Sequence, residues 1–302
     1  MTVRLPTGSP RFFPLLLGLL AATLLSACSP RQLVMDRLAD ELAVQSGGDE
    51  NDLELARDAA PYHLKLSETL LRQNPDHLGL AEAVTAGFTQ YAYAFVAFDA
   101  DRIEGQDVAA ANRLRQRAAR LYRRASDHAL TALERAHPGF RQALNDPAQP
   151  PTLPPAQAGL GYWAAAAWAG AISLSKDDPD AVADLPLAVR LAEIAWQADP
   201  DWGQGSLTGL RATLEAARPG GSRTQALRWF DQAIAQGGTD NVGPLLGKAE
   251  GYALPAGDRP LFEQLLRQAL AVHEPAGSPL TLSNEVMRRR ARWLLDSADD
   301  LF

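Results

Sequence analysis

Apolar side chains recur at helical spacing through most of the chain after residue 30. Leu114, Ala118, Leu121 and Ala125 occupy the i, i+4, i+7 and i+11 positions of one helix face, and the apolar residues of 226–234 and 261–270 are spaced in the same way. No stretch of five or more residues alternates convincingly between apolar and polar, as a half-buried strand would. We therefore expect an all-α fold of about ten or eleven helices, separated by breaks rich in proline and glycine.

A second, longer periodicity relates whole helices to one another. A small or apolar residue recurs at one phase, five positions before a proline in the first three cases; these residues are Leu70, Leu133, Ala195, Ala233 and Ala269. The last two intervals are close to the tetratricopeptide period of about 34 residues. The spacing predicts stacked antiparallel helix pairs, a TPR-like α-solenoid with a concave surface. The alternative is a nonrepetitive helical bundle whose loops happen to contain proline.

One segment of the chain is unusually apolar. Residues 147–175 carry no charge, and the stretch 161–174 resembles a membrane span. The segment consists mostly of alanine and glycine, however, and its first third is rich in proline. Small side chains let helices approach closely, so we expect a buried repeat helix here rather than a transmembrane helix.

The N-terminal residues have the layout of a secretory signal. Arg4 and Arg11 precede an apolar stretch at 12–25, and no acidic residue occurs in 1–27. The sequence LSAC, ending at Cys28, resembles the bacterial lipobox, in which the cysteine thiol accepts a diacylglycerol. Ser29 rather than aspartate follows it, which favours the outer membrane. The alternative is ordinary cleavage next to a chance cysteine.

These boundaries divide the chain into three parts. We expect a signal peptide at 1–27, a tether and first helix at 28–52, and the repeat domain at 53–302. The formal charge of −7 would become −9 once Arg4 and Arg11 are removed with the signal, which argues against a nucleic-acid partner. A single cysteine excludes disulfides within the chain.

The sequence contains no convincing catalytic or metal-binding motif. Ser206 lies one position too early for a nucleophile elbow between Gly205 and Gly209, and no strand precedes it. The five histidines form no HExxH pattern, and the acidic residues of 177–184 lack the glycine and glutamate of a calcium loop. We therefore expect a protein that is not an enzyme and that needs no cofactor or metal.

Two aromatic groups and one basic group are the candidate partner-binding residues. Tyr91 and Phe95 share one helix face, while Tyr162, Trp163 and Trp168 lie on a second helix; they either line a groove or pack between repeats.

The C-terminal helix, expected at about 281–297, has an apolar stripe that includes Ala291 and Leu294 and should cap the last repeat. Arg288, Arg289 and Arg292 are then expected on its outer side, either as a solvated face or as a docking site for an acidic partner.

Several longer segments resemble one known family in order. They are LYRRASDHAL at 121–130, YWAAAAW at 162–168, DPDWG at 199–203, AEGYALP at 249–255, RRARWLL at 289–295 and the closing DLF. Together they are similar to the T-component family of TRAP (tripartite ATP-independent periplasmic) transporters, from about residue 58 to residue 302.

The resemblance implies a lipid-anchored periplasmic protein of divergent tetratricopeptide units, self-associating as a trimer. It implies docking of the substrate-binding P component, transfer of ligand to or from it, and no catalysis. The membrane contact would be through the lipid anchor only. A general envelope scaffold lipoprotein remains the alternative function.

Overall fold

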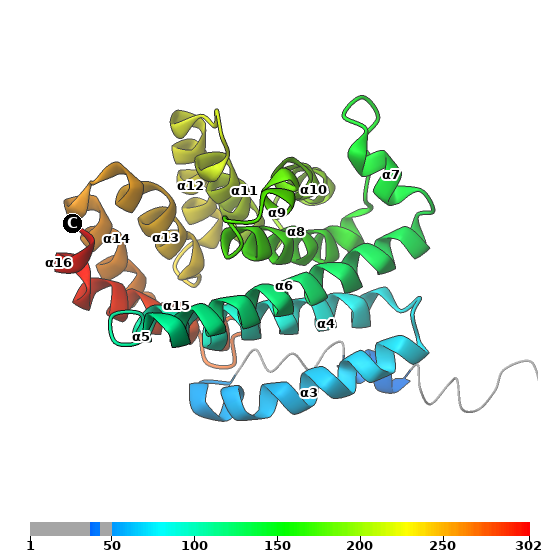
Figure 1. Ribbon diagram of the computed structural model, residues 1–302, viewed down its shortest axis with the longest axis horizontal. Helices are drawn as coiled ribbons and strands as arrows, with labels where there is room; N and C mark the ends of the chain where they lie inside the picture. The colour runs from blue at the N-terminus through cyan, green and yellow to red at the C-terminus, as the bar shows by residue number, and fades with distance from the viewer. Residues whose placement is uncertain (1–36, 43–49) are drawn as a thin grey trace, which may run out of the picture.

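The computed structural model describes residues 37–42 and 50–302, and over these residues the fold is all-α with no strand (Figure 1). The expected all-α class is therefore confirmed. Residues 37–42 form a short helical segment, and the predicted signal peptide and lipobox lie outside the described residues.

The first half of the fold consists of three long antiparallel elements. A short turn connects α3 (Leu53–Gln73) to α4 (Leu78–Tyr91). α4 continues through a π-helical turn, η1 (Ala92–Ala97), into α5 (Phe98–Ile103). α6 (Val108–Ala136) runs back along α4, η1 and α5, and the short α7 (Phe140–Asn145) follows it. The π-helical turn therefore lies in the middle of one nearly continuous helix rather than at its end.

The second half consists of shorter helices stacked in chain order. They are η2 (Pro155–Gln157), α8 (Ala158–Ser173), α9 (Pro179–Ala183), α10 (Leu185–Ala198), α11 (Ser206–Ala217), α12 (Arg223–Gly237), α13 (Gly243–Lys248), η3 (Ala249–Ala253), η4 (Leu254–Ala256), α14 (Arg259–Leu270), α15 (Thr281–Asp296) and α16 (Ala298–Leu301). α8 packs on α4, α6 and α10, and α11 packs on α12 and α13, so neighbouring units cover one another's apolar faces. Like η1, η3 is a π-helical turn.

Aspartate and serine side chains cap the N-termini of many of these helices. Asp52 accepts hydrogen bonds from the backbone N–H groups of Glu54 and Leu55, and Asp107, Ser222 and Asp258 cap α6, α12 and α14 in the same way. These caps satisfy N–H groups that have no partner within the helix, so the polar breaks in the sequence also define where each helix begins.

The small residues of the predicted repeat phase lie at the seams between helices. Ala195 and Ala233 are fully buried, as are the equivalent Leu133 and Ala269, while Leu70 is almost so. A Cβ at Gly161 on α8 would lie 2.9 Å from the Cβ of Ala195. A Cβ at Gly205 would overlap the backbone carbonyl of Ala233. Glycine facing alanine therefore sets the close spacing of the helices at both seams.

An arginine between two tryptophans ties three consecutive helices together. The guanidinium of Arg211 on α11 lies 3.9 Å from the ring centre of Trp196 on α10 and 4.0 Å from that of Trp229 on α12. It also pairs with Glu193, and its side chain is buried. Because burial would otherwise penalise the charge, the two π faces and the carboxylate make its position favourable.

The apolar segment 147–175 is not a transmembrane helix. Among residues 37–42 and 50–302, no helix combines the length and the apolarity that a membrane crossing requires. Its helical part, α8, lies inside the stack, where Gly170 lets the ring of Tyr122 approach: a Cβ there would be 2.8 Å from the ring. The small residues thus serve helix packing, as expected from the sequence.

The C-terminal helix packs on the last unit and also returns to the first half of the fold. Ala291 and Leu294 on α15 are buried against α13 and α14, as the apolar stripe predicted. On its other side, Trp293 meets the ring of Phe98 edge-on at 5.6 Å, and Met287 accepts a long hydrogen bond from the Tyr93 hydroxyl. α15 is therefore a bridge between the two ends of the stack as well as a cap.

Candidate functional site

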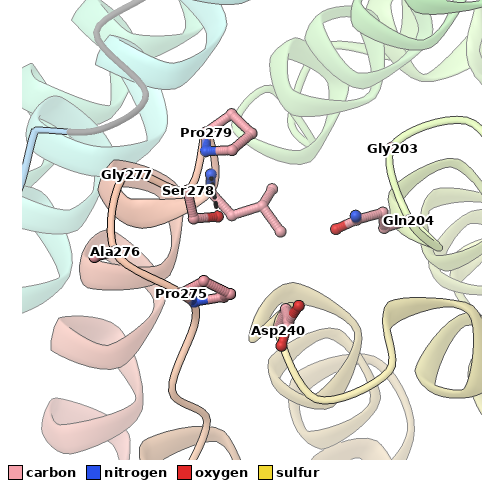
Figure 2. A pocket seen from close by; sticks show the side chains of 9 residues that line it. Gly203, Gln204, Asp240, Pro275, Ala276, Gly277, Ser278 and Pro279 are labelled. Atoms are coloured by element: carbon pink, nitrogen blue, oxygen red, sulfur yellow. Dashed lines mark hydrogen bonds between the residues drawn. The ribbon is translucent and has the colours of Figure 1, made fainter.

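A cavity of about 460 Å³ lies where three loops of the second half meet (Figure 2). Its walls are Gly203 and Gln204 from the α10–α11 turn, Asp240 from the α12–α13 turn, and the α14–α15 loop 275–280. In Figure 2 the Gln204 side chain points from its turn toward the 275–279 loop. We call this cavity the three-loop pocket.

The α10–α11 turn brings a strained backbone to the edge of the three-loop pocket. Gly203, Gln204 and Gly205 all have positive φ, at 64°, 48° and 88°, and Gln204 is not a glycine. The amide of the buried Asn241 holds this turn by donating hydrogen bonds to the carbonyls of Gly203 (3.4 Å) and Gln204 (2.9 Å). Residues kept in this region cost about 1–3 kcal/mol and cluster at functional sites.

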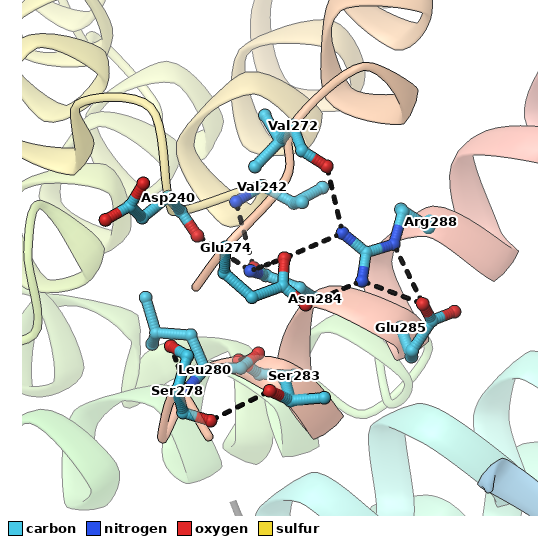
Figure 3. A network of polar contacts seen from close by, with 11 residues as sticks. Asp240, Val242, Val272, Glu274, Ser278, Leu280, Ser283, Asn284, Glu285 and Arg288 are labelled. Carbon is cyan, nitrogen blue, oxygen red and sulfur yellow. Dashed lines mark hydrogen bonds and ion pairs between the residues drawn. The ribbon is translucent and has the colours of Figure 1, made fainter. Parts of the chain in front are cut away.

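A second asparagine braces the other two loops (Figure 3). Asn284 on α15 is fully buried, donates to the Asp240 carbonyl at 2.7 Å and to a Glu274 carboxylate oxygen at 2.9 Å, and accepts from the Val242 amide at 3.0 Å. All the hydrogen-bonding groups of this side chain are thus satisfied across three segments. The walls of the three-loop pocket are consequently fixed by side chains that the pocket itself does not expose.

The same network contains a buried ion pair between Arg288 and Glu274. Two guanidinium nitrogens of Arg288 lie 2.9 Å from the two Glu274 oxygens, and a third contact reaches Glu285 at 2.8 Å. The hydrogen bonds from Arg288 hold the pKa of Glu274 at about 2, although burial alone would raise it. This pair forms the floor of a second, smaller cavity of about 290 Å³ that is also lined by His273 and Arg292.

The expected outward position of Arg288 and Arg289 is wrong. Arg288 is only 8% exposed and points into the Glu274 network. Arg289 donates to the carbonyl of Ala94 and lies over the ring of Phe95, because α15 has a partner on both sides. Of the three predicted arginines, Arg292 is the exposed one.

Arg290, the next residue along α15, pairs with carboxylates on two other elements. It meets Glu250 on η3 at 2.7 Å and Asp101 on α5 at 3.0 Å, with Tyr93 of η1 beneath it at 5.6 Å. Burial alone would lower the pKa of Arg290, but these carboxylates outweigh that effect and raise it well above its ordinary value. The two π-helical turns and α5 therefore converge on one guanidinium.

Two tyrosines, Tyr93 and Tyr122, lie near Arg290, and Tyr162 lies near Tyr93. Burial raises the pKa of Tyr162 to about 12, and it also raises the pKa values of Tyr93 and Tyr122. The charges of Arg290, Glu250 and Asp101 act on Tyr93, which places these groups in one environment. The phenols are neutral hydrogen-bonding groups at physiological pH.

The predicted aromatic residues fall into three separate places. Tyr91 and Phe95 meet at 5.7 Å, and Phe95 is buried. Tyr162 and Trp163 form a half-buried cluster with Trp202, whose ring centre is 4.6 Å from that of Tyr162. Trp168 lies apart and donates to the Asp184 carboxylate at 3.3 Å.

The Tyr162–Trp163–Trp202 cluster is joined to the three-loop pocket through the α10–α11 turn. Trp202 immediately precedes Gly203, so one turn supplies both an aromatic neighbour and a pocket wall. The sequence pointed to Tyr162 and Trp163 but not to Gln204, Asp240, Asn241 or Asn284. A signal for the turn was available in the Gly-Gln-Gly triplet, but the asparagines carry no pattern of their own.

The described residues offer hydrogen bonding and apolar contact rather than metal chemistry. No group of three or more histidine, cysteine, aspartate or glutamate side chains among residues 37–42 and 50–302 could hold a metal ion. The three-loop pocket has one carboxylate, one amide and one hydroxyl among apolar proline and leucine side chains. Such a lining suits a small polar group of a partner or solute that donates hydrogen bonds.

Comparison with known proteins assigns the family. A model of the TRAP transporter T-component matches residues 49–302, which includes every element from α3 to α16. The chain belongs to the TRAP transporter T-component family. It is also 27% identical over 304 residues to an uncharacterized protein of Treponema pallidum (strain Nichols), covering 92% of this chain and 94% of that one.

Membership in the T-component family gives the chain a role in a TRAP transporter system. A component of this kind associates with its transport system, and its family suggests a non-enzymatic role. The helical stack with its three-loop pocket is the part of the chain available for that role.

Proposed function

We propose that this T-component is a non-enzymatic, lipid-anchored accessory protein of a TRAP-type solute uptake system. It docks the substrate-binding P component in the periplasm and passes ligand to or from it. The observation that carries the docking proposal is the three-loop pocket, whose walls are held by Asn241 and Asn284. A preformed, rigid recess loses little conformational entropy when a partner occupies it.

The half-buried Tyr162–Trp163–Trp202 cluster, next to the three-loop pocket, further supports docking at this surface. Trp163 and Trp202 combine large contact area with few rotatable bonds, which is typical of residues that dominate binding energy. Arg292 is exposed beside the second cavity and is proposed as a peripheral charge contact. Phe95, Arg288 and Arg289 contribute indirectly, because Phe95 and Arg288 are buried and the half-buried Arg289 is engaged with the Ala94 carbonyl and the Phe95 ring.

The proposed localisation rests on Cys28. Acylation of this cysteine would hold the protein at a membrane, and Ser29 favours the outer membrane. Several acyl chains anchor a protein durably, since each buried methylene contributes about 0.8 kcal/mol. From the family resemblance we also propose that the protein assembles as a trimer. Sedimentation of the detergent-solubilised protein measures the mass of the assembly and so tests this.

Site-specific photo-crosslinking in the producing cell tests the docking proposal. A photoreactive amino acid replaces Ala276, which is exposed on the pocket loop, and in a matched control it replaces Gln142 on α7. We expect a crosslink to a TRAP P component from position 276 and not from 142. Crosslinks from 276 to peptidoglycan or other envelope proteins alone would favour the general scaffold instead.

Lipidation is tested separately. The wild-type protein should incorporate a fatty-acid analogue and remain with the membrane fraction. Cys28→Ala should abolish the label and release the protein into the soluble periplasm. Persistent labelling of the variant contradicts acylation at this cysteine.

A further inference from the structure

The first long helix carries an apolar stripe that nothing in the described structure covers. Leu55, Tyr62 and Leu66 on α3 are 56%, 76% and 37% exposed. Together with Ala59 they occupy the i, i+4, i+7 and i+11 positions, which lie on one face of the helix. The opposite face contains Leu64, Leu70 and Leu71, which are buried in the main core. We call the exposed residues Leu55, Ala59, Tyr62 and Leu66 the α3 stripe.

The position of the preceding segment relates this stripe to the membrane anchor. Within residues 37–42, Ala39 and Leu42 are buried in the same core as Leu70 and Leu80, and Asp40 meets His77 at 3.0 Å. His77 caps α4 just after α3 ends, so this segment is fixed at the C-terminal end of α3, as the dark blue segment in Figure 1 shows. Leu66 lies in that half of the helix, and Tyr62 lies next to its midpoint.

Chain length then limits how far this end can be from the bilayer. Nine residues lead from Cys28 to Arg37, and an extended chain spans at most about 3.6 Å per residue, or roughly 30 Å in all. An acylated Cys28 would therefore keep the C-terminal end of α3 within about one helix length of the lipid surface. Leu38, 42% exposed in the fixed segment, adds a further apolar side chain at the same end.

We infer that the α3 stripe is a membrane-contact surface, on which the body of the protein rests against the lipid interface beside its anchor. The inference rests on the acylation of Cys28 proposed above. The partner is the apolar and interfacial part of a bilayer, for which leucine and tyrosine are suited. Asp58 and Lys65 flank the stripe with opposite charges, so the contact is apolar rather than electrostatic.

The width of the stripe favours a bilayer over a second copy of the chain. A stable protein–protein interface takes about 20–30 residues from each side, whereas the stripe has four. A lipid anchor removes that requirement, because tethering makes the second contact intramolecular and raises its effective concentration. A weak apolar contact then suffices to orient the protein with α3 toward the membrane and α12 away from it, on the opposite side of the fold (Figure 1).

Spin-label accessibility on the full lipidated protein tests the orientation. Acylation consumes the thiol of Cys28, the single cysteine, so Tyr62→Cys provides one free thiol for labelling, and Gln232→Cys on α12 is the matched control. The protein is reconstituted in vesicles of phosphatidylethanolamine and phosphatidylcholine. We expect the ratio of oxygen to nickel-chelate accessibility at position 62 to be several-fold higher in vesicles than for the same labelled, unaggregated protein in detergent-free buffer. The ratio at position 232 should be the same in both samples. High salt should not alter the result.

Two outcomes overturn the inference. A label at 62 that stays as accessible to the nickel chelate as the label at 232 excludes membrane contact. Immobilisation at 62 without increased oxygen access, dependent on protein density in the vesicle, assigns the stripe to a second copy instead. Mass spectrometry of the same sample reports acylation independently, so loss of the anchor is distinguished from an anchored protein whose stripe faces water.

In a second variant, Tyr62→Glu with the label at Leu55→Cys, the membrane signal at 55 should be lost while the anchor persists.

Discussion

Arg290 and Asp101 form an ion pair at 3.0 Å although 189 positions separate them in the chain. The same guanidinium meets Glu250 at 2.7 Å, so one side chain joins α15, α5 and the π-helical turn η3. The bidentate geometry suits arginine, whose planar fork of donors fits carboxylates. Arg290 therefore holds the last long helix of the stack against the first half of the fold.

Replacing Arg290 by methionine should destabilise the protein strongly. Methionine keeps the apolar stem but leaves Glu250 and Asp101 without their counter-ion, and breaking a buried pair in this way typically costs about 3–5 kcal/mol. Because both carboxylates are about one-quarter exposed, we expect a loss nearer to about 2–3 kcal/mol, measured by urea unfolding.

Arg292→Met is the matched control on the same helix. Its side chain is exposed, so the change in unfolding free energy should stay within about 0.5 kcal/mol. Equal losses in the two variants would contradict the bridging role of Arg290.

The Arg288–Glu274 pair should make stability depend on pH in the acid range. The pKa of Glu274 lies at about 2, below its ordinary 4.5, so the native state favours the ionised form. The stabilisation is present above about pH 4.5 and is lost as pH falls toward 2. A shift of this size corresponds to about 3 kcal/mol.

Glu274→Gln should remove this pH dependence while keeping the shape of the side chain. The measurement is the free energy of unfolding of wild type and variant across the window from 4.5 to 2. The difference between the two should shrink as pH falls. A constant difference would show that Glu274 titrates normally in the folded protein.

Overpacking at a helix seam should destabilise the stack. Ala195 is fully buried beside Gly161, so tryptophan there should cost about 1–3 kcal/mol or more and lower the thermal midpoint by several degrees. Gln232→Trp, at an exposed position on α12, is the suitable comparison and should change the midpoint little.

Two glycines with positive φ separate the effect of backbone strain from the effect of close packing. Gly205 (φ 88°) faces the carbonyl of Ala233, whereas Gly220 (φ 72°) has open space around its Cα. Gly220→Ala should cost about 1 kcal/mol for the left-handed conformation alone. Gly205→Ala should cost clearly more, about 2–4 kcal/mol, because the new methyl group displaces a backbone carbonyl at the seam. Equal melting temperatures for the two variants would contradict that close approach.

Periodicity along the chain was sufficient to predict the helices and the small residues between them. Ala195, Ala233 and Ala269 were recognised by their spacing and are all fully buried. Such a prediction succeeds because a helix exposes the same face every three to four residues, so burial leaves a local trace in the sequence. The ordered motifs were likewise sufficient for the family, which the match over residues 49–302 confirms.

The direction of the C-terminal arginines was decided by tertiary structure alone. The spacing of apolar residues predicts a solvent-exposed side of α15 only if other helices cover one side of it alone. α15 packs on α14 and also contacts α3 and the Ala94 region, so both of its sides are covered. Arg289 and Arg290 consequently face partners that are nearly two hundred positions away in the chain. The three-loop pocket is of the same kind, because Gln204, Asp240 and Asn284 meet through the curvature of the stack. The sequence by itself determined the helices, their seams and the family, since these depend on local repetition. Only the folded chain decided which polar groups meet, since those contacts depend on the summed angles of many helix packings.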